Sequence, residues 1–228
     1  YLNHLRLKWK SLIQLQYVAL VPLEYWQTTD GERLAGCVAS QGGLLGGVIV
    51  PPFEEKACFK SLEKILKLAN HFGCGIDLHI DESQDSPASG LNLLVKVLEH
   101  CPSSIPITCS HSSSMGMLPE KELRDLANRL AQYQVKIIAL PLTNSWLLGR
   151  NGRVTSSQRP LAPIYQLQKA GVVVAVGADN VNDSWFPLGR FDPIQLMAFS
   201  LPIAHLSPWE RLGLSPFTTA AANLVGLE

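Results

Sequence analysis

Short apolar stretches recur along this chain at intervals near 30 residues, and proline, glycine or polar clusters bound each of them. Most lack polar alternation, which predicts strands that are buried on both faces of a parallel sheet. Six strands are predicted, over residues 15–21, 44–50, 76–80, 106–111, 135–140 and 172–176. Successive strand ends are 29, 29, 32, 29 and 39 residues apart, counted from Val21, Val50, His79, His111, Leu140 and Asp179. This spacing is the length of a repeated strand–helix unit.

Helical periodicity fills the segments between the strands. Residues 53–72 carry a leucine and isoleucine stripe beside exposed Glu and Lys, and Gly73 ends this predicted helix. A helix beginning near Asp30 as N-cap is predicted to end at residues 41–43. Further helices are predicted over residues 2–13, 87–100, 119–133, 163–169, 193–206 and 218–224. The segment between Pro141 and the helix at 163 is predicted to be a long loop.

Two α/β folds compete for this pattern, an open doubly wound sheet and a (β/α)8 TIM-type barrel. No strand is followed by the glycine-rich nucleotide signature of the open sheet. His79, His111 and Asp179 stand at three different strand ends, which a barrel brings round one mouth. The sequence therefore predicts one partial barrel domain over residues 1–228. Its six strands are expected to be strands 3 to 8, with the first two missing at the N-terminus.

The amino-acid composition limits the classes of function that this chain can have. Hydrophobic residues make up 46% of the chain and charged residues only 17%, enough apolar material for a large core. Lys plus Arg equals Asp plus Glu at 19 each, so no net field favours nucleic acid or a membrane surface. No apolar run is long enough for a membrane span. A small neutral ligand agrees better with this equal number of positive and negative charges. A homo-oligomer is compatible with the composition.

The five cysteines are scattered, odd in number and contain no C-x-x-C pair. This pattern argues against a disulfide framework and against a cysteine zinc site, and a reducing cytoplasm is its simplest setting.

The candidate catalytic and metal-binding residues cluster at the end of the third predicted strand. His79 is followed closely by Asp81 and Glu82. Burying unpaired charge is costly, so these residue types suit a metal or proton-transfer site better than a core. A solvated loop mouth with the acids facing water explains them equally well on residue type alone. Other deaminase and hydrolase signatures, G-x-S-x-G and H-x-E with P-C-x-x-C, do not occur.

Three strand-end motifs in order resemble cytosine deaminase and its close relatives in the amidohydrolase superfamily. They are His79-Ile80-Asp81-Glu82, Ser110-His111-Ser112, and Gly177-Ala178-Asp179-Asn180 with Trp185-Phe186-Pro187-Leu188-Gly189. Supporting similarity lies at residues 15–19, 46–49, 141–144, 149–150 and 219–224, so the resemblance covers essentially the whole chain.

The resemblance implies a hydrolytic deaminase with one divalent metal ion, zinc or iron. His79 and Asp179 would be metal ligands, Glu82 the acid and base that carries a proton to the ring, and His111 the residue that orients the attacking hydroxide. Trp185 and Asn180 would contact the substrate. The expected reaction releases ammonia from a cytosine-like aminopyrimidine or a related cyclic amidine.

The chain departs from the family pattern in three places. It contains no H-x-H, the source of two further metal ligands, so the ligand set is expected to be incomplete and this fragment alone inactive or nearly so. The family's glutamine after the first predicted strand is absent from Val21-Pro22-Leu23, and Asn180 replaces an aspartate. Because the last two changes fall on expected substrate contacts, the sequence supports a deaminase as the class of enzyme better than it supports cytosine as the substrate. The alternative is a truncated, non-catalytic homologue that acts as a binding or assembly partner.

Overall fold

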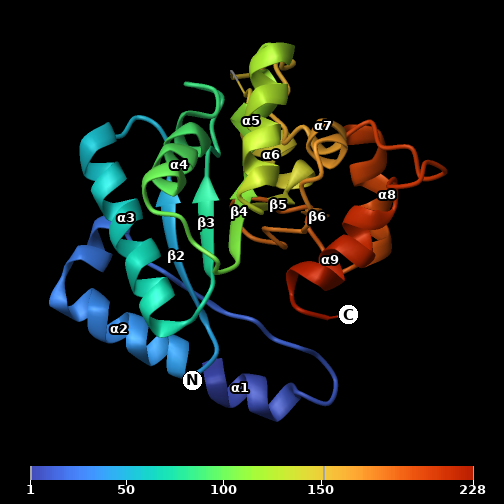
Figure 1. Cartoon of the computed structure of the whole chain (residues 1–228). Coiled ribbons are helices and arrows are strands. Elements are labelled where there is room, and N and C mark those ends of the chain that lie inside the picture. Colours follow the sequence, from blue (N-terminus) through green and yellow to red (C-terminus); the bar gives the residue numbers. More distant parts are fainter. Residues whose placement is uncertain (1, 151, 228) are drawn as a thin grey trace.

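The computed structural model describes residues 2–150 and 152–227, and its centre is a parallel sheet (Figure 1). The sheet has six strands, whose order in space is their order in the chain: β1 (Val18–Leu20), β2 (Leu44–Ile49), β3 (Ile76–Ile80), β4 (Ile107–His111), β5 (Lys136–Ala139) and β6 (Val174–Val176). Every neighbouring pair is parallel. All the carboxyl ends therefore lie along one edge, as the spacing of the apolar stretches predicts.

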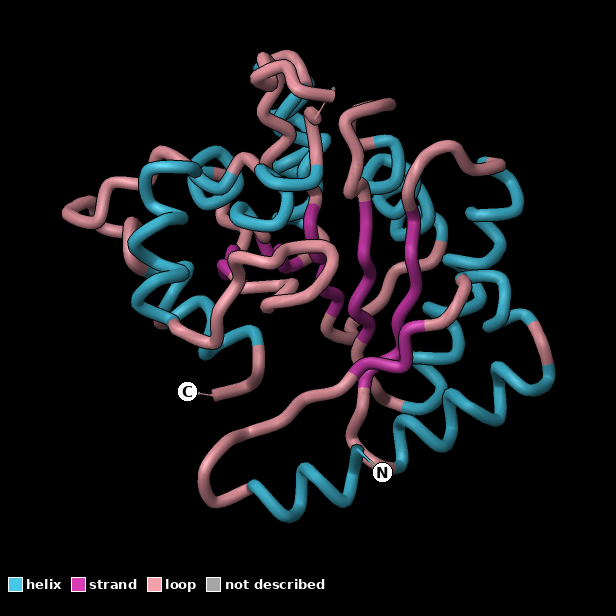
Figure 2. Tube along the Cα trace, turned by 180° about the vertical axis from the view of Figure 1, so that it is seen from behind, coloured by secondary structure: helices cyan, strands magenta, loops and turns pink. Residues whose placement is uncertain are grey.

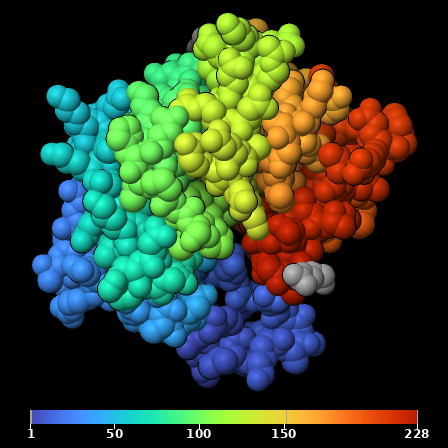
Figure 3. Space-filling view, in the orientation of Figure 1, coloured from blue at the N-terminus to red at the C-terminus, as the bar shows by residue number. Residues whose placement is uncertain are grey.

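Helices return the chain between the strands. The α-helices are α1 (Leu2–Trp9), α2 (Thr29–Ser40), α3 (Glu55–Phe72), α4 (Ser89–His100), α5 (Glu120–Gln132), α6 (Pro141–Leu147), α7 (Ile164–Lys169), α8 (Pro193–Ile203) and α9 (Thr219–Leu224). Short 3-10 turns are η1 (Leu23–Gln27), η2 (Ser113–Met117) and η3 (Ser215–Phe217). In the space-filling view, successive segments follow one another across the outer face from cyan through green and yellow to red (Figure 3).

The core lies between the sheet and this outer layer of helices. Strand residues such as Leu45, Leu78 and Ile137 are at most 1% exposed and pack with the apolar stripes of the helices. The stripe of α3 contributes Leu62 and Ile65, both fully buried. Burying such a side chain contributes about 1.5–3 kcal/mol, which explains why the apolar pattern of the sequence selects this layer.

The other face of the sheet is polar in its middle. Register places Val48, His79, Ser110 and Ile138 in one row across β2 to β5, so their side chains share this inner face. Seen from behind, the central strands have no helix in front of them (Figure 2). Val48 is accordingly 47% exposed although it lies in the second strand of the sheet. The inner face is where His79 enters the site.

Most predicted boundaries are confirmed to within a few residues, and two predictions are wrong. The N-cap of α2 is Thr28, whose hydroxyl accepts from the Gly31 amide at 3.0 Å, while Asp30 lies inside the first turn. The segment after Pro141 is not a long loop throughout, because Pro141–Leu147 forms α6. Proline at the first turn of a helix is favourable, and the prediction treated it only as a strand stop.

β1 and β6 are the edge strands of the described sheet. All five cysteines are free. None of the helices in the described part of the chain has both the length and the apolar character needed to cross a bilayer.

Candidate metal and proton-transfer site at the strand ends

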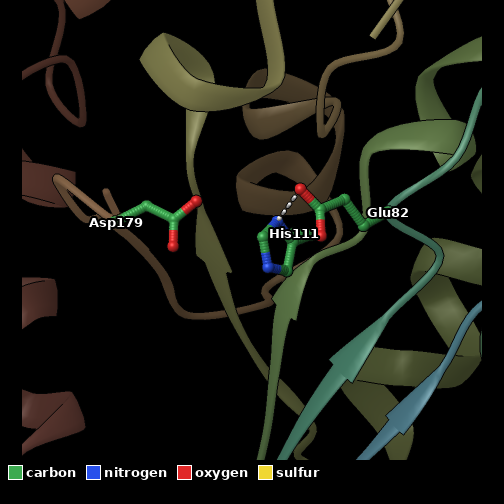
Figure 4. A group of neighbouring side chains, drawn as sticks. All are labelled: Glu82, His111 and Asp179. Carbon is green, nitrogen blue, oxygen red and sulfur yellow. Dashed lines mark ion pairs between the residues drawn. The ribbon is translucent and has the colours of Figure 1, made fainter. Parts of the chain in front are cut away.

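Three side chains converge at the carboxyl edge of the sheet (Figure 4). Glu82 follows β3, His111 is the last residue of β4, and Asp179 follows β6. One ligand atom from each lies within 4.8 Å of the others. His111 is 2% exposed, while Glu82 and Asp179 lie nearer to solvent. Two carboxylates and an imidazole at this separation are donors that suit a divalent cation.

His79 joins this cluster through His111. The Nε2 atom of His111 lies 3.1 Å from the Nδ1 atom of His79, and the two ring centroids are 5.0 Å apart. His79 is therefore beside the three-residue cluster, though it is not one of the three whose ligand atoms lie within 4.8 Å of one another.

The backbone turns His111 toward His79. His111 is paired with Ile80, whose side chain lies on the helix side of the sheet. Simple alternation would place the His111 ring on that side too. His111 instead has a φ of 70°, and Ser112 after it has a φ of 52°. The left-handed backbone at the strand end redirects the ring, which reaches the inner-face residue His79.

Asp81 fixes the turn that carries Glu82. Asp81 has a φ of 55° and its side chain is fully buried. The two carboxylate oxygens accept from the amides of Gly90 and Leu91, in the first turn of α4, each at 2.8 Å. Its carbonyl oxygen accepts from the turn after β4, at 3.1 Å from the Ser114 amide and 3.0 Å from the Ser113 hydroxyl. Two segments, the first turn of α4 and the turn after β4, therefore hold the residue that precedes Glu82.

Burial shifts the titration of the site. Burial, reinforced by the nearby Asp179 carboxyl, raises the pKa of Glu82 to about 7. Protein atoms packed around Asp179 raise the pKa of that carboxyl also, although the residue reaches solvent. Burial and the neighbouring His79 ring lower the pKa of His111 to about 3. At neutral pH His111 is therefore neutral, and its 3.4 Å contact with Glu82 involves an uncharged imidazole.

Asn144 is a site residue that the sequence interpretation did not single out. It lies on α6 and is 1% exposed. Its amide nitrogen is 3.2 Å from Nδ1 of His111 and 3.4 Å from Oε1 of Glu82. The resemblance included residues 141–144, but the predicted loop gave no reason for this side chain to point into the site. The helix that begins at Pro141 supplies that reason.

Trp185 and Asn180, the two expected substrate contacts, lie on the loop between β6 and α8. The Asn180 amide donates to the Asp183 carboxylate at 2.8 Å, and that carboxylate also accepts from the amides of Trp185 and Phe186. These bonds order the loop and lower the pKa of Asp183. The Trp185 ring is 60% exposed, so it stands at the rim and not against the cluster.

A cavity of about 920 Å³ opens next to the loop that carries Asp179, and Glu82, His111 and Asp179 are not among its lining residues. Its wall includes Ala178, the residue before Asp179, and aromatic side chains from α6, from the loop after β6 and from α8: Trp146, Phe186, Phe191 and Phe199. The rings of Trp146 and Phe186 meet edge to face with centroids 6.2 Å apart. The cavity is mostly apolar and offers flat surfaces to a ring-shaped ligand.

Acids and a histidine gathered at the strand ends of a parallel strand–helix repeat are typical of the active sites of barrel enzymes. Residues 38–225 match the model of the amidohydrolase family, and the chain belongs to that family.

Curated relatives include the pterin deaminase of Rhizobium rhizogenes (strain K84 / ATCC BAA-868), which is 29% identical over 228 residues, covering 98% of this chain and 51% of the relative. The N-isopropylammelide isopropyl amidohydrolase of Pseudomonas sp. (strain ADP) is 24% identical over 96% of this chain and 51% of its own length. The chain thus spans about half the length of the curated relatives it matches.

Among solved structures, 5-methylcytosine deaminase from Klebsiella pneumoniae liganded with phosphonocytosine superposes with a TM-score of 0.83 at 24% identity, covering 99% of this chain and 55% of that one. The fold is therefore the parallel strand–helix repeat of part of a TIM-type barrel, as the sequence predicts.

Proposed function

We propose that this chain carries the proton-transfer and metal-binding part of a hydrolytic deaminase, which converts a cytosine-like aminopyrimidine or a related cyclic amidine and releases ammonia. The observation that carries the proposal is the convergence of Glu82, His111 and Asp179 at one edge of the sheet, with a Glu82 pKa near neutral. A general acid and base works best when its pKa lies near the working pH. The family and its deaminase relatives support this reaction class.

The donor set fits a divalent cation. Two carboxyl groups with raised pKa values face each other across the cluster, and a cation would favour the ionised form of both. We assign His79 and Asp179 as the residues that would hold zinc or iron, with the neutral ring of His111 beside them. A cation bound there would supply a water molecule activated as a nucleophile near neutral pH.

Side chains of this chain are proposed to carry out the proton transfers and to orient the attacking water. Glu82 takes a proton from the attacking water at Oε1 and delivers it to a ring nitrogen of the substrate. The second proton of the water leaves with the exocyclic amino group as ammonia, so atoms and protons balance. His111 stays neutral, since its pKa is about 3, and hydrogen-bonds the attacking oxygen without repelling a cation.

The cavity bears on the substrate class. Its 920 Å³ and its aromatic walls lie next to the segment that carries Asp179 and offer room for more than a bare pyrimidine ring. Relatives act, by their names, on a pterin and on an N-isopropyl-substituted ring. We therefore include bicyclic and N-substituted aminopyrimidines among the cyclic amidines proposed as substrates. Trp185 and Asn180, on the loop at the rim, are proposed to contact the ring.

The test is release of ammonia from cytosine, isocytosine and pterin, and of isopropylamine from N-isopropylammelide, by the protein expressed from its complete coding sequence. Glu82→Gln is expected to lower the rate on the best substrate by roughly 10²–10⁴-fold, the contribution of a positioned acid and base. Glu63→Gln, in a surface ion pair with Lys67, is the matched control and should leave the rate unchanged.

Equal rates for the wild type and Glu82→Gln would show that the mechanism is wrong. If the cation-loaded protein bound one of these heterocycles but released neither ammonia nor isopropylamine from any of them, the non-catalytic binding role would replace the deaminase proposal.

A further inference from the structure

A second cavity, of about 340 Å³, lies between α7 and the segment that follows α8, and it shares no lining residue with the larger cavity. Figure 1 shows α7 beside α8. Tyr165, Gln168 and Lys169 of α7 form one wall, and residues 205–207 and 210–213 form the other. No residue of the strand-end cluster lines this cavity, so it is separate from the site proposed for catalysis.

Positive charge collects around this cavity. Lys169 and Arg211 line it, and the Arg159 guanidinium lies directly behind the wall, with Nη1 3.2 Å from Nε2 of His205. Glu210 is the one acid among the described lining residues. In the described part of the chain, none of these four charged side chains forms an ion pair. Three positive charges against one negative leave a local excess of two, in a chain whose formal net charge is zero. Unpaired cations around a concave surface attract anions.

Apolar surface makes up the rest of the wall. Leu206 is buried, while Leu212 is 42% exposed and Tyr165 is 56% exposed. The Gln168 amide donates to the Leu212 carbonyl oxygen at 3.1 Å and joins the two walls. An aromatic ring such as that of Tyr165 offers a flat face on which a planar group stacks. The volume is at the lower end of the range for small-molecule sites, roughly 300–1,000 Å³, and suits a single ring that carries an anionic group.

We propose that this cavity binds a phosphate monoester that carries a planar ring, with the phosphate against Lys169 and Arg211 and the ring against Tyr165. A phosphate monoester carries a charge of about −1.5 to −2 at pH 7, which matches the local excess of two positive charges better than the single charge of a carboxylate. Arg and Lys are the side chains that bind phosphate through charge-assisted hydrogen bonds. Binding here needs neither a metal ion nor the proposed reaction, so this inference is independent of the proposed function.

Phenyl phosphate is the probe, titrated by calorimetry into chelator-treated protein expressed from its complete coding sequence. Inorganic phosphate supplies the anion without a ring, and benzoate supplies a ring with a single charge. Phenyl phosphate should bind most tightly of the three, and its affinity should fall as salt is added, because salt screens exposed charges. Nitrogen-15 NMR should place the ligand-induced shifts at the backbone amides of Gln168 and Gly213, one on each wall of the cavity.

Two variants remove one positive charge each from the cavity. Lys169→Gln and Arg211→Gln should each weaken the binding of phenyl phosphate roughly tenfold, the effect of losing one hydrogen bond to a charged group. Lys121→Gln makes the same change of charge at an exposed position on α5, away from the cavity, and should leave the affinity unchanged. Tyr165→Leu should reduce the preference for phenyl phosphate over inorganic phosphate.

No detectable binding of phenyl phosphate, or equal affinity for all three probes, would overturn the proposal. Shifts confined to the strand-end site would overturn it too, and the wild-type titration decides even if a variant fails to fold. Among folded variants, equal affinities of Lys169→Gln, Arg211→Gln and Lys121→Gln would show that the two cations of the cavity do not hold the phosphate.

Discussion

Replacing Asp81 by alanine tests whether the turn that carries Glu82 is held by the bonds described above. The carboxylate is fully buried and accepts the amides of Gly90 and Leu91 at 2.8 Å each. Alanine leaves both amides buried without a partner, at about 1–3 kcal/mol each. We therefore expect Asp81→Ala to lower the free energy of unfolding by about 2–6 kcal/mol at mildly acidic pH, measured by urea denaturation.

The loss should depend on pH in a defined direction. Burial raises the pKa of Asp81 from 3.8 to about 6 in the folded protein. A raised pKa means that the contribution of Asp81 to stability is full below about pH 4 and falls as pH rises through 6. The pKa difference corresponds to about 3 kcal/mol at most. The destabilisation by Asp81→Ala should therefore be smaller at pH 8 than at pH 5.

Glu54 provides the matched control for Asp81. Its exposed side chain also accepts two backbone amides, those of Lys56 and Ala57, at the start of α3. Water can replace the lost bonds there, so Glu54→Ala should cost only about 1 kcal/mol. If Asp81→Ala cost no more than Glu54→Ala at pH 5, or if its effect grew toward pH 8, burial would not be the source of the restraint on the turn.

Three further predictions concern the site and the fold. Burial raises the pKa of Glu82 from 4.5 to about 7, so the contribution of Glu82 to the free energy of unfolding falls as pH rises between these values. In chelator-treated protein, Glu82→Gln should therefore flatten the dependence of the free energy of unfolding on pH in this range. Zinc should raise the melting temperature of the wild type more than that of Asp179→Asn, and a chelator should reverse the rise; equal shifts would exclude Asp179 as a ligand. Gly31→Ala should lower the melting temperature by several degrees in calorimetry, because the new Cβ would stand 2.2 Å from the Tyr25 carbonyl oxygen.

The apolar pattern was sufficient to predict the sheet because burial on the helix side dominates the energetics of each strand. β3 matches its predicted range, 76–80, at both ends, and the other strands differ by a few residues where the apolar stretch continues into a loop. Alternation also places His79 correctly, on the inner face beside Val48 and Ser110. These features depend on local pattern and on burial, both of which are legible in the residues themselves.

α6 and Asn144 could not be predicted in the same way. Pro141 follows a strand and stops it, and the same residue also opens a helix because its missing amide hydrogen is not needed there. Pattern alone does not decide between these two effects. The contact of Asn144 with His111 depends on how α6 packs above the end of β4, which joins residues 33 positions apart.

The geometry of the site arises where strand alternation ends. Asp81, His111 and Asp179 all have positive φ values, of 55°, 70° and 60°. Such values are uncommon outside glycine, and Asp and His are among the residues enriched there. Asp81 comes directly after β3, His111 ends β4, and Asp179 lies three residues beyond the end of β6. The period of two along a strand therefore predicts neither the direction of the His111 ring nor the position of Glu82. Strained backbone of this kind persists only where surrounding bonds hold it, and the buried bonds of Asp81 are of that kind. The residue types at these strand ends thus indicate where the site lies, while the packing of α4, η2 and α6 decides which atoms meet.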